Sequence, residues 1–475
     1  VVGGIKVDSS SKIVANGGTT AAIAVENTNT FGGGISNAGL LSATHHHDGI
    51  LVGSVSTFSG GIRNRGTIVA GSFGVVVSSA TVFTGGITNS GHISNDGGPA
   101  IAVENVTSFS GGIVNASGGV INPLHGGIVV RGISIFSGGI ANSGTILSDD
   151  NSGIDVFLVS TFSGAITNSG RISAQFIGID LFAAIAFGTS MPGGGIVNTG
   201  KISAGTGIDI GQMSTFLGGI SNSGTISAGN AGILVGYSLS TQSLPVTSFV
   251  GNVVNNGTIT AKTGIGIAHA TIDGAIVDSG TIRASGDGIL ISSGGAVLGG
   301  IQVASHGVIS AHSGISVIGA TALGGITNSG VISAGKTGVN ISGVTTVLGG
   351  IVNRGTITAK QATGDMGIFV TEVRVFGDSS AGGGITNTGT ISAADQAILL
   401  QSVATFAGAI VNSGKLVAET GIHNGFFTVF GASTSGGITN TGTITASERG
   451  IFLNNGTIFT GVVANTRADS GRFHA

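Results

Sequence analysis

The segment Phe216–Ala228 contains the pattern that decides the fold, and its sequence is Phe-Leu-Gly-Gly-Ile-Ser-Asn-Ser-Gly-Thr-Ile-Ser-Ala. Apolar and polar residues alternate in steps of two through its second half, which is typical of β-strands. After a short turn the alternation continues in Gly232–Val235, whose sequence is Gly-Ile-Leu-Val. The segment therefore predicts about three short strands that are joined by tight turns.

The same unit recurs through the whole chain, with clear copies at Phe58–Ala70 and Gly436–Ala446. The position after the Gly pair, of which the second Gly is replaced in five units, is Ile or Val in 18 units, most of them 23 to 28 residues apart, with gaps of 30 to 34 where loops are inserted. A fixed period of this kind is the signature of a repeat architecture. The residues after the Gly pair are Ile5, Ile35, Ile62, Ile87, Ile113, Ile140, Ile166, Ile196, Ile220, Val253, Ile276, Ile301, Ile326, Ile351, Ile385, Ile410, Ile438 and Val463.

The length of the repeat selects the fold. A unit of roughly 25 residues is too short for a propeller blade, and Gly and β-branched residues in every unit exclude helical repeats. We therefore expect an all-β protein, a single-stranded parallel β-helix (β-solenoid) of about 18 coils that forms one domain over residues 1–475. Coils stacked about 4.8 Å apart would make a rod about 85 Å long.

Stacking places equivalent residues of successive coils above one another, so each repeated residue forms a column. The Asn column should form a hydrogen-bonded ladder at a corner, with left-handed backbone at the Asn and positive φ at the Gly two residues later. Asp278 and Val303 interrupt this column and predict a local irregularity. Its members are Asn37, Asn64, Asn89, Asn115, Asn142, Asn168, Asn198, Asn222, Asn255, Asn328, Asn353, Asn387, Asn412 and Asn440.

A second column is aromatic and should fill the interior together with the Ile columns. It consists of Phe31, Phe58, Phe83, Phe109, Phe136, Phe162, Phe216, Phe249, Phe406 and Phe459.

Composition excludes several classes of protein. The net charge is -3 and the basic residues are dispersed, whereas nucleic-acid-binding proteins usually carry clustered Lys and Arg. There is no Cys, so neither disulfides nor thiolate metal sites can form. No window approaches the roughly 18 unbroken apolar residues of a membrane helix. We therefore expect no cofactor, no nucleic-acid partner and no membrane span in this fragment.

The chain begins Val1-Val2-Gly3, with neither an initiator Met nor a signal peptide. We interpret this beginning as that of a processed, mature fragment, with trimming as the alternative.

The repeat, written as Gly-Gly-Ile-Thr-Asn-Ser-Gly-Thr-Ile-Ser-Ala, resembles the Gly-rich passenger repeats of bacterial autotransporters over nearly the whole chain. In that family the passenger is a right-handed β-helix that is exported from the cell. The resemblance therefore implies right-handed winding and an extracellular or outer-surface location. It supplies no functional residue.

Three carboxyl groups occupy the same place in successive coils: Asp155, Asp180 and Asp209. The alternation points them outward, roughly 5 Å apart. Such a column can bind Ca²⁺ or raise one carboxyl pKa for acid–base work, and it can equally be a solvated acidic patch. No Lys or Arg stands at a matching position to support lyase chemistry. The segment His45–Asp48 is the other candidate metal site, but three adjacent His residues on an extended turn cannot all face one ion.

The middle residue of each Gly-Ile-x-Val segment should also face outward, yet it is often apolar. An exposed apolar stripe on a rod favours self-association, unless inserted loops fold over it. The stripe consists of Leu51, Val76, Ala102, Val129, Leu234, Leu290, Phe369, Leu399 and Phe452.

The two ends of the predicted rod lack a charged or helical cap. Ile5, Val1 and Val2 lie at one end, and Val462 and Val463 lie at the other. Bare strand edges at unlike ends can pair head-to-tail, and such contacts grow without closing.

These features support three hypotheses for function. The first is an extracellular structural protein that self-associates head-to-tail into fibres or a surface coat. The second is a monomeric, surface-displayed adhesin that binds host or abiotic surfaces. The third and weakest is a polysaccharide-active enzyme that uses the three Asp residues, and we do not expect the protein to be an enzyme.

Overall fold

The computed structural model describes residues 3–17, 21–190, 194–236, 246–377, 383–431, 436–456 and 458–466. It divides into two compact units, which are described separately. Unit 1 comprises Val1–Asn252 with Gly257–Ala261, and unit 2 comprises Val253–Asn256 with Lys262–Ala475. The prediction of a single domain stays a prediction.

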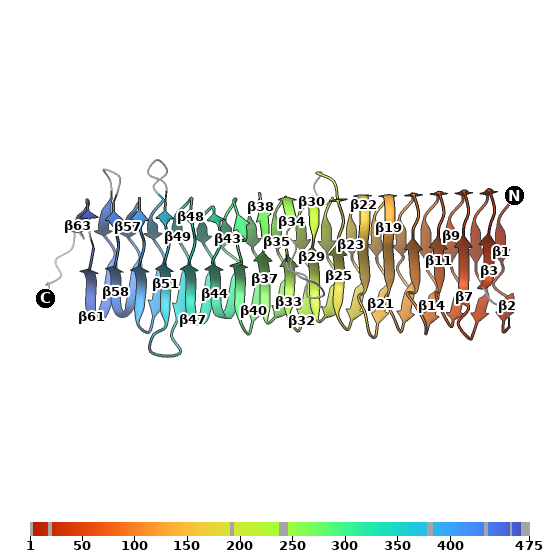
Figure 1. Cartoon of the computed structure of the whole chain (residues 1–475). Coiled ribbons are helices and arrows are strands. Elements are labelled where there is room, and N and C mark those ends of the chain that lie inside the picture. Colours follow the sequence, from red (N-terminus) through yellow and green to blue (C-terminus); the bar gives the residue numbers. More distant parts are fainter. Residues whose placement is uncertain are drawn as a thin grey trace. The chain divides into compact units, whose positions relative to one another are not determined.

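Both units are parallel β-solenoids, which confirms the predicted fold class. One coil of unit 1 contains β9 (Ile62–Asn64), β10 (Thr67–Ala70), β11 (Val75–Ser78) and β12 (Val82–Phe83). Each of these strands pairs in parallel, and without a shift, with its equivalent in the next coil. We call the four sets of equivalent strands columns 1 to 4. Figure 1 shows the strands of each column side by side.

Column 1 contains the repeated Ile or Val of every unit. Its described strands in unit 1 are β1 (Ile5–Val7), β5 (Ile35–Asn37), β9, β13 (Ile87–Asn89), β17 (Ile113–Asn115), β20 (Ile140–Asn142), β23 (Ile166–Asn168), β27 (Ile196–Asn198) and β31 (Ile220–Asn222). Those in unit 2 are β35 (Val253–Asn255), β39 (Ile276–Asp278), β43 (Ile301–Val303), β46 (Ile326–Asn328), β49 (Ile351–Asn353), β53 (Ile385–Asn387), β57 (Ala409–Asn412), β60 (Gly437–Asn440) and β63 (Val462–Asn465).

Some coils join two columns in one longer strand. In unit 1, columns 3 and 4 are continuous in β19 (Ile128–Ser137) and β22 (Ile154–Ser163). In unit 2, columns 2 and 3 are continuous in β44 (Val308–Ile318), β47 (Val331–Ser342), β58 (Lys415–Gly425) and β61 (Thr443–Asn454). Register shifts occur between Ala311 and Ser313 and between Ala418 and Thr420.

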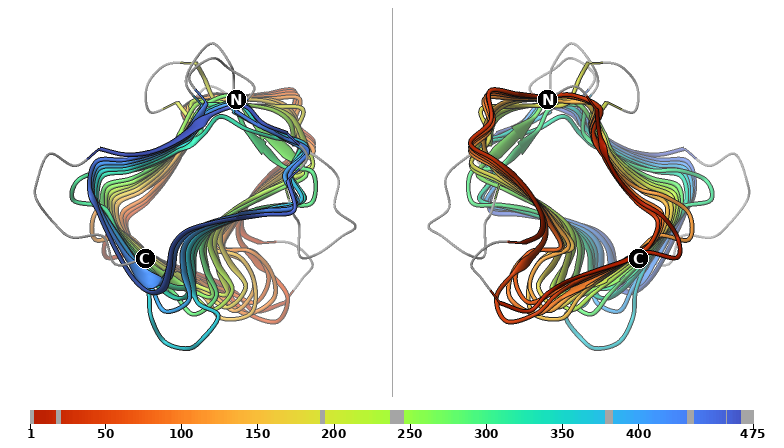
Figure 2. Two further views of the ribbon diagram at one scale, coloured as in Figure 1. Left: turned by 90° about the vertical axis from the view of Figure 1, so that its left-hand side faces the viewer. Right: turned by 90° about the vertical axis from the view of Figure 1, so that its right-hand side faces the viewer.

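Each coil has a narrow arm at the turn between columns 2 and 3, and it then bends inward along column 3 (Figure 2). In the arm, Ile68 of column 2 lies against Gly49, which is in the column 3 strand β7 (Asp48–Gly53) of the preceding coil. A Cβ at Gly49 would overlap with the Ile68 side chain and with the carbonyl oxygen of Gly74. The first Gly of Gly-Ile-x-Val is therefore required because the two walls of the arm are in contact.

The Asn side chains form a buried ladder along each unit. In unit 1 each Asn from Asn37 to Asn198 donates from Nδ2 to Oδ1 of the next Asn, over 2.7 to 2.9 Å. In unit 2 the same bonds run from Asn328 through Asn440. These side chains are at most 5% exposed, so the ladder satisfies buried amides that would otherwise lack partners.

The Phe side chains stack in the interior. From Phe31 to Phe249 in unit 1, neighbouring ring centroids are 4.6 to 5.2 Å apart. The column also includes Phe187, Phe376 and Phe430, which the sequence pattern missed. Each of these three is separated from its Gly pair by inserted residues, so the motif is interrupted although the side chain keeps its place.

The expected backbone conformation at the Asn corner is wrong. The Asn residues of the ladder and the Gly residues that follow them, such as Gly224, do not have positive φ. Gly224 is needed for another reason: an added Cβ would overlap with the carbonyl oxygen of Gly200 in the preceding coil. Positive φ occurs instead at the Gly pair, where Gly218 has φ 90° and Gly219 has φ 73°.

The local irregularity that we expected at Asp278 and Val303 is absent from the backbone of these strands. Column 1 keeps its register from Asn255 through Asp278 and Val303 to Asn328. The ladder is interrupted chemically, because Asp278 accepts a 2.7 Å bond from Asn255 and its Oδ2 has no described hydrogen-bond partner. Burial raises the pKa of Asp278 to about 6.

The ladder should contribute measurably to stability. Replacing Asn115 by Ala removes the acceptor of Asn89 and the donor to Asn142. We expect a loss of about 1–3 kcal/mol in the free energy of unfolding, measured by urea denaturation, because buried polar groups lose their partners. The control Asn230→Ala alters an exposed Asn of the same unit. Equal stabilities of the two variants would contradict a stabilising ladder.

Gly224→Ala should be strongly destabilising because the coils have no room for a Cβ at this position. The matched control is Gly229→Ala in the same coil, where the nearest atom to an added Cβ is the Gly205 oxygen at 3.8 Å. We expect a lower urea midpoint and faster proteolysis for Gly224→Ala alone. A tolerated Gly224→Ala variant would show that the coils can separate locally.

Candidate functional site

The carboxyl groups of Asp155, Asp180 and Asp209 lie in register on column 3 of unit 1. They belong to β22, β25 (Ile177–Phe182) and β29 (Thr206–Gly211). Asp155 pairs with Asp180, and Asp180 pairs with Asp209. The structure therefore brings together the three residues that the sequence pattern selected, and we call them the carboxylate column.

The carboxylate column faces outward, but it is not freely solvated. Asp155 and Asp180 are half-buried, and Asp209 is only 2% exposed. Column 3 lies where the backbone of the coil bends inward (Figure 2). The Oδ1 atom of Asp209 is buried and has no hydrogen-bond partner among the described residues.

A second column lies beside it, two residues further along the same outward face. It contains Glu104 of β15 (Ile101–Glu104), Arg131 of β19, Phe157 of β22 and Phe182 of β25, in register. Arg131 Nη2 forms an ion pair of 2.8 Å with Glu104 Oε2. The two Phe side chains are half-buried. The sequence pattern did not select this column, although Arg131, Phe157 and Phe182 each stand two residues after a position that it did select.

Burial raises the pKa of all three column carboxyls. It raises the pKa of Asp155 to about 6, against the opposing effect of the Arg131 charge. Burial, with repulsion from Asp155 and Asp209, raises the pKa of Asp180 to about 8. Burial raises the pKa of Asp209 to about 7, although the Ile210 backbone N–H donates to it. Asp180, and in part Asp209, therefore hold a proton at neutral pH that an ordinary Asp would release.

This arrangement limits the chemistry available. Carboxyls one coil apart have the separation of about 5 Å that retaining glycosidases use, and a raised pKa suits a general acid. The three carboxyl groups lie along one line, whereas the ligands of a metal ion must surround the ion. No group of three or more His, Asp or Glu residues in the described part of the chain is arranged to hold a metal ion.

Two exposed apolar side chains adjoin the second column. Leu158 is 59% exposed, and Ile185, at the start of column 4 in the next coil, is 58% exposed. Leu158 has φ 54°, at a corner where other coils have Ser54 or Asn105. A bulky residue is unusual in this conformation. The repeat pattern did not select Leu158 and Ile185 because they lie outside the repeated motif.

The predicted apolar stripe of column 3 is only partly exposed, because four of its nine residues are buried and five are half-buried. Ala102 is fully buried, while Val76, Val129 and Leu399 are 4%, 6% and 5% exposed. The other members are half-buried: Leu51, Leu234, Leu290, Phe369 and Phe452. The inward bend of the coil shields them, which the alternation of residues along a strand cannot reveal.

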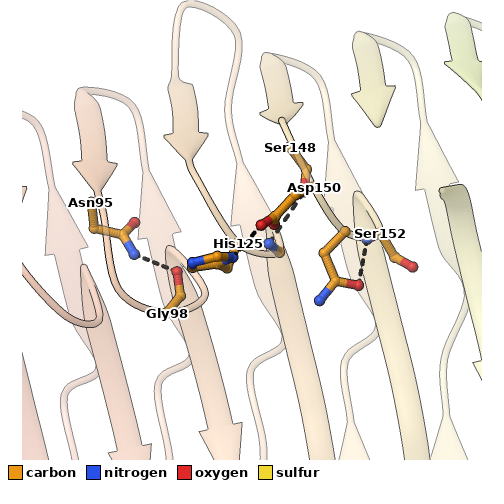
Figure 3. Close-up of polar contacts among 8 residues, drawn as sticks. Asn95, Gly98, His125, Ser148, Asp150 and Ser152 are labelled. Carbon is orange, nitrogen blue, oxygen red and sulfur yellow. Dashed lines mark hydrogen bonds and ion pairs between the residues drawn. The ribbon is translucent and has the colours of Figure 1, made fainter. Parts of the chain in front are cut away.

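The segment His45–Asp48 does not converge on a single point. His45 Nδ1 contacts Thr44 Oγ1 at 2.9 Å, His47 is 8% exposed, and the Asp48 carboxyl accepts a 3.0 Å bond from the Phe73 backbone N–H. Other polar groups fix the turns of neighbouring arms (Figure 3). Among them, His125 Nδ1 and Asp150 Oδ2 are 2.6 Å apart, and Ser148 Oγ accepts a bond from the Gly126 N–H.

Of the residues predicted to mediate end-to-end contacts, three are described. Ile5 is half-buried in β1, whereas Val462 and Val463 of β63 are 71% and 46% exposed. Val1 and Val2 lie outside the described residues.

No protein-family model matches the chain, and no curated protein and no solved structure is significantly similar to it. The resemblance to autotransporter passengers therefore stays a prediction. The described residues include no helix with the length and apolar character needed to cross a membrane.

The raised pKa values predict that acid stabilises unit 1. Because the folded-state pKa of Asp180 is about 8 and the ordinary value is 3.8, the folded state binds its proton more tightly. This contribution is complete below about pH 4 and is lost as pH rises through 8. Asp180→Asn cannot ionise, so its urea midpoint should exceed that of the wild type at pH 8.5 and match it at pH 4.

The control Asp149→Asn alters an exposed carboxyl of the same unit and should leave the pH profile unchanged. If the Asp180→Asn variant retained the full pH dependence of the wild type, other groups would be responsible for it.

Proposed function

We propose that the protein is a structural element of the cell exterior, a stiff solenoid that forms part of a surface coat or fibre. The observation that carries this proposal is the pair of ladders within each unit. Amide hydrogen bonds and stacked rings repeat at every coil of unit 1 from Asn37 and Phe31 onward. Bonds that run along the stack resist bending and local opening, which is the property required of a stalk or coat.

The surface chemistry is consistent with this role. Only 8% of the residues are charged, and Ser, Thr and Gly occupy many outward positions of the repeat. The resemblance to autotransporter passengers supports an extracellular or outer-surface location. Head-to-tail association of copies of this chain is part of the proposal, and the exposed Val462 and Val463 are the residues that we expect to take part.

A monomeric adhesin is the second candidate. It is favoured by the exposed side chains of Leu158 and Ile185 in unit 1, which stand close in the sequence to the half-buried Phe157 and Phe182. Apolar side chains that gather on one exposed face are typical of a binding surface.

Immunogold electron microscopy of intact cells that produce the protein should show label on the outside of the cell, along fibres or a coat. Purified protein should form assemblies that persist on tenfold dilution in analytical ultracentrifugation. Val463→Lys should shorten the assemblies, because a charge on the strand edge opposes stacking. The matched control is Thr439→Lys on β60, which alters an outward position of the same column.

Each outcome has a distinct meaning. Label confined to the cell interior would contradict an exterior role. Protein that stays monomeric and adheres to surfaces, with adhesion lost in Leu158→Ser, would favour the adhesin over the fibre.

A further inference from the structure

We propose that the carboxylate column of unit 1, together with Phe157 and Phe182, is a binding site for a linear organic polyamine. Asp155, Asp180 and Asp209 would each accept hydrogen bonds from an ammonium group of the ligand. The proposal concerns a small-molecule site on the wall of the solenoid and does not depend on whether copies of the chain associate.

The unmet hydrogen-bonding capacity of the site consists of acceptors. Asp209 is only 2% exposed, and its Oδ1 atom has no hydrogen-bond partner among the described residues. A buried acceptor of this kind calls for a donor from outside the chain. A primary ammonium group has three donors and no acceptor, so one such group can bond to several carboxylate oxygens.

In the described part of unit 1, little positive charge faces the column. Arg131 is the basic residue whose charge acts on Asp155, and its guanidinium group is already paired with Glu104 at 2.8 Å. The charges that act on Asp180 are those of Asp155 and Asp209, which repel it. A ligand with several positive charges would relieve this repulsion, and a neutral ligand would not.

The aromatic rings complete the site. Phe157 and Phe182 follow Asp155 and Asp180 by two residues on the same outward face, and they are in register with each other. Ring faces attract cations, and the methylene groups of a polyamine also pack against apolar surface. Val129 and Leu234 occupy the equivalent positions before and after the three Asp residues, so the charged stretch is three coils long.

The spacing of the column matches a chain with several amines. Successive carboxyls are one coil apart, about 4.8 Å. A trimethylene spacer holds two ammonium groups at a similar separation, so one ligand can meet neighbouring carboxyls in turn. This regular spacing distinguishes a polyamine site from a site for a single ion, which requires ligands that surround a point.

Isothermal titration calorimetry with spermidine tests the proposal. We expect saturable binding at pH 7 that is at least tenfold weaker in Asp180→Asn and in Asp209→Asn, and unchanged in the exposed control Asp149→Asn. Binding should weaken in 0.5 M salt. It should also release protons, detected by titration in buffers of different ionisation enthalpy, because an ammonium group lowers the pKa of the carboxyls that it contacts. Circular dichroism and the urea midpoint establish that each variant is folded.

Parallel titrations use glucose, as a neutral polyol, and magnesium chloride. Spermidine binding that is equal in all variants, or no saturable binding at all, would overturn the proposal. Glucose binding with the same dependence on Asp180 and Asp209 would assign the site to neutral glycans. Displacement of spermidine by stoichiometric Mg²⁺ would assign it to a metal. Phe157→Ala with unchanged affinity would remove the aromatic contribution from the site and overturn that part of the proposal.

Discussion

The parallel register between successive coils is the constraint on which the rest of this structure depends. Each strand completes its backbone hydrogen bonds with the equivalent strand of the next coil, so equivalent residues are held about 4.8 Å apart. Each position therefore favours residue types that can pack against an identical residue in the next coil. Asn115 and Phe109 satisfy the constraint, since amides can bond in series and rings can stack.

The same constraint makes a repeated carboxyl costly. Asp180 has Asp155 on one side and Asp209 on the other, and burial on a concave face adds to the repulsion. Asp278 shows the contrast within the Asn ladder of unit 2. A single carboxyl accepts the bond from Asn255 and keeps the strand register, but it cannot donate onward to Val303. Repetition along a solenoid thus stabilises amides and aromatic rings and destabilises like charges.

The abundance of Gly has three separate structural causes. The Gly pair at Gly218 and Gly219 adopts positive φ at a corner. Gly224 leaves room for the carbonyl oxygen of the preceding coil, and Gly49 leaves room for the side chain that crosses the arm. Two of these three causes are contacts between successive coils. At Gly224 and Gly49 the requirement for Gly is therefore steric, and the conformational preference of Gly does not explain it.

The sequence by itself determined the fold class, the length of the repeat, the inward position of the Ile and Phe columns and the hydrogen-bonded Asn ladder, because the two-residue alternation and the period are local properties. It also selected Asp155, Asp180 and Asp209 from their shared place in the unit. Only the tertiary structure decided that Val129 is shielded, that the pKa of Asp180 rises to about 8, and that Phe157 and Phe182 lie beside the carboxyls. It alone placed Phe187 in its column despite an insertion. These properties depend on the outline of the coil, with its arm and inward bend, and that outline results from contacts between residues that are distant in the chain.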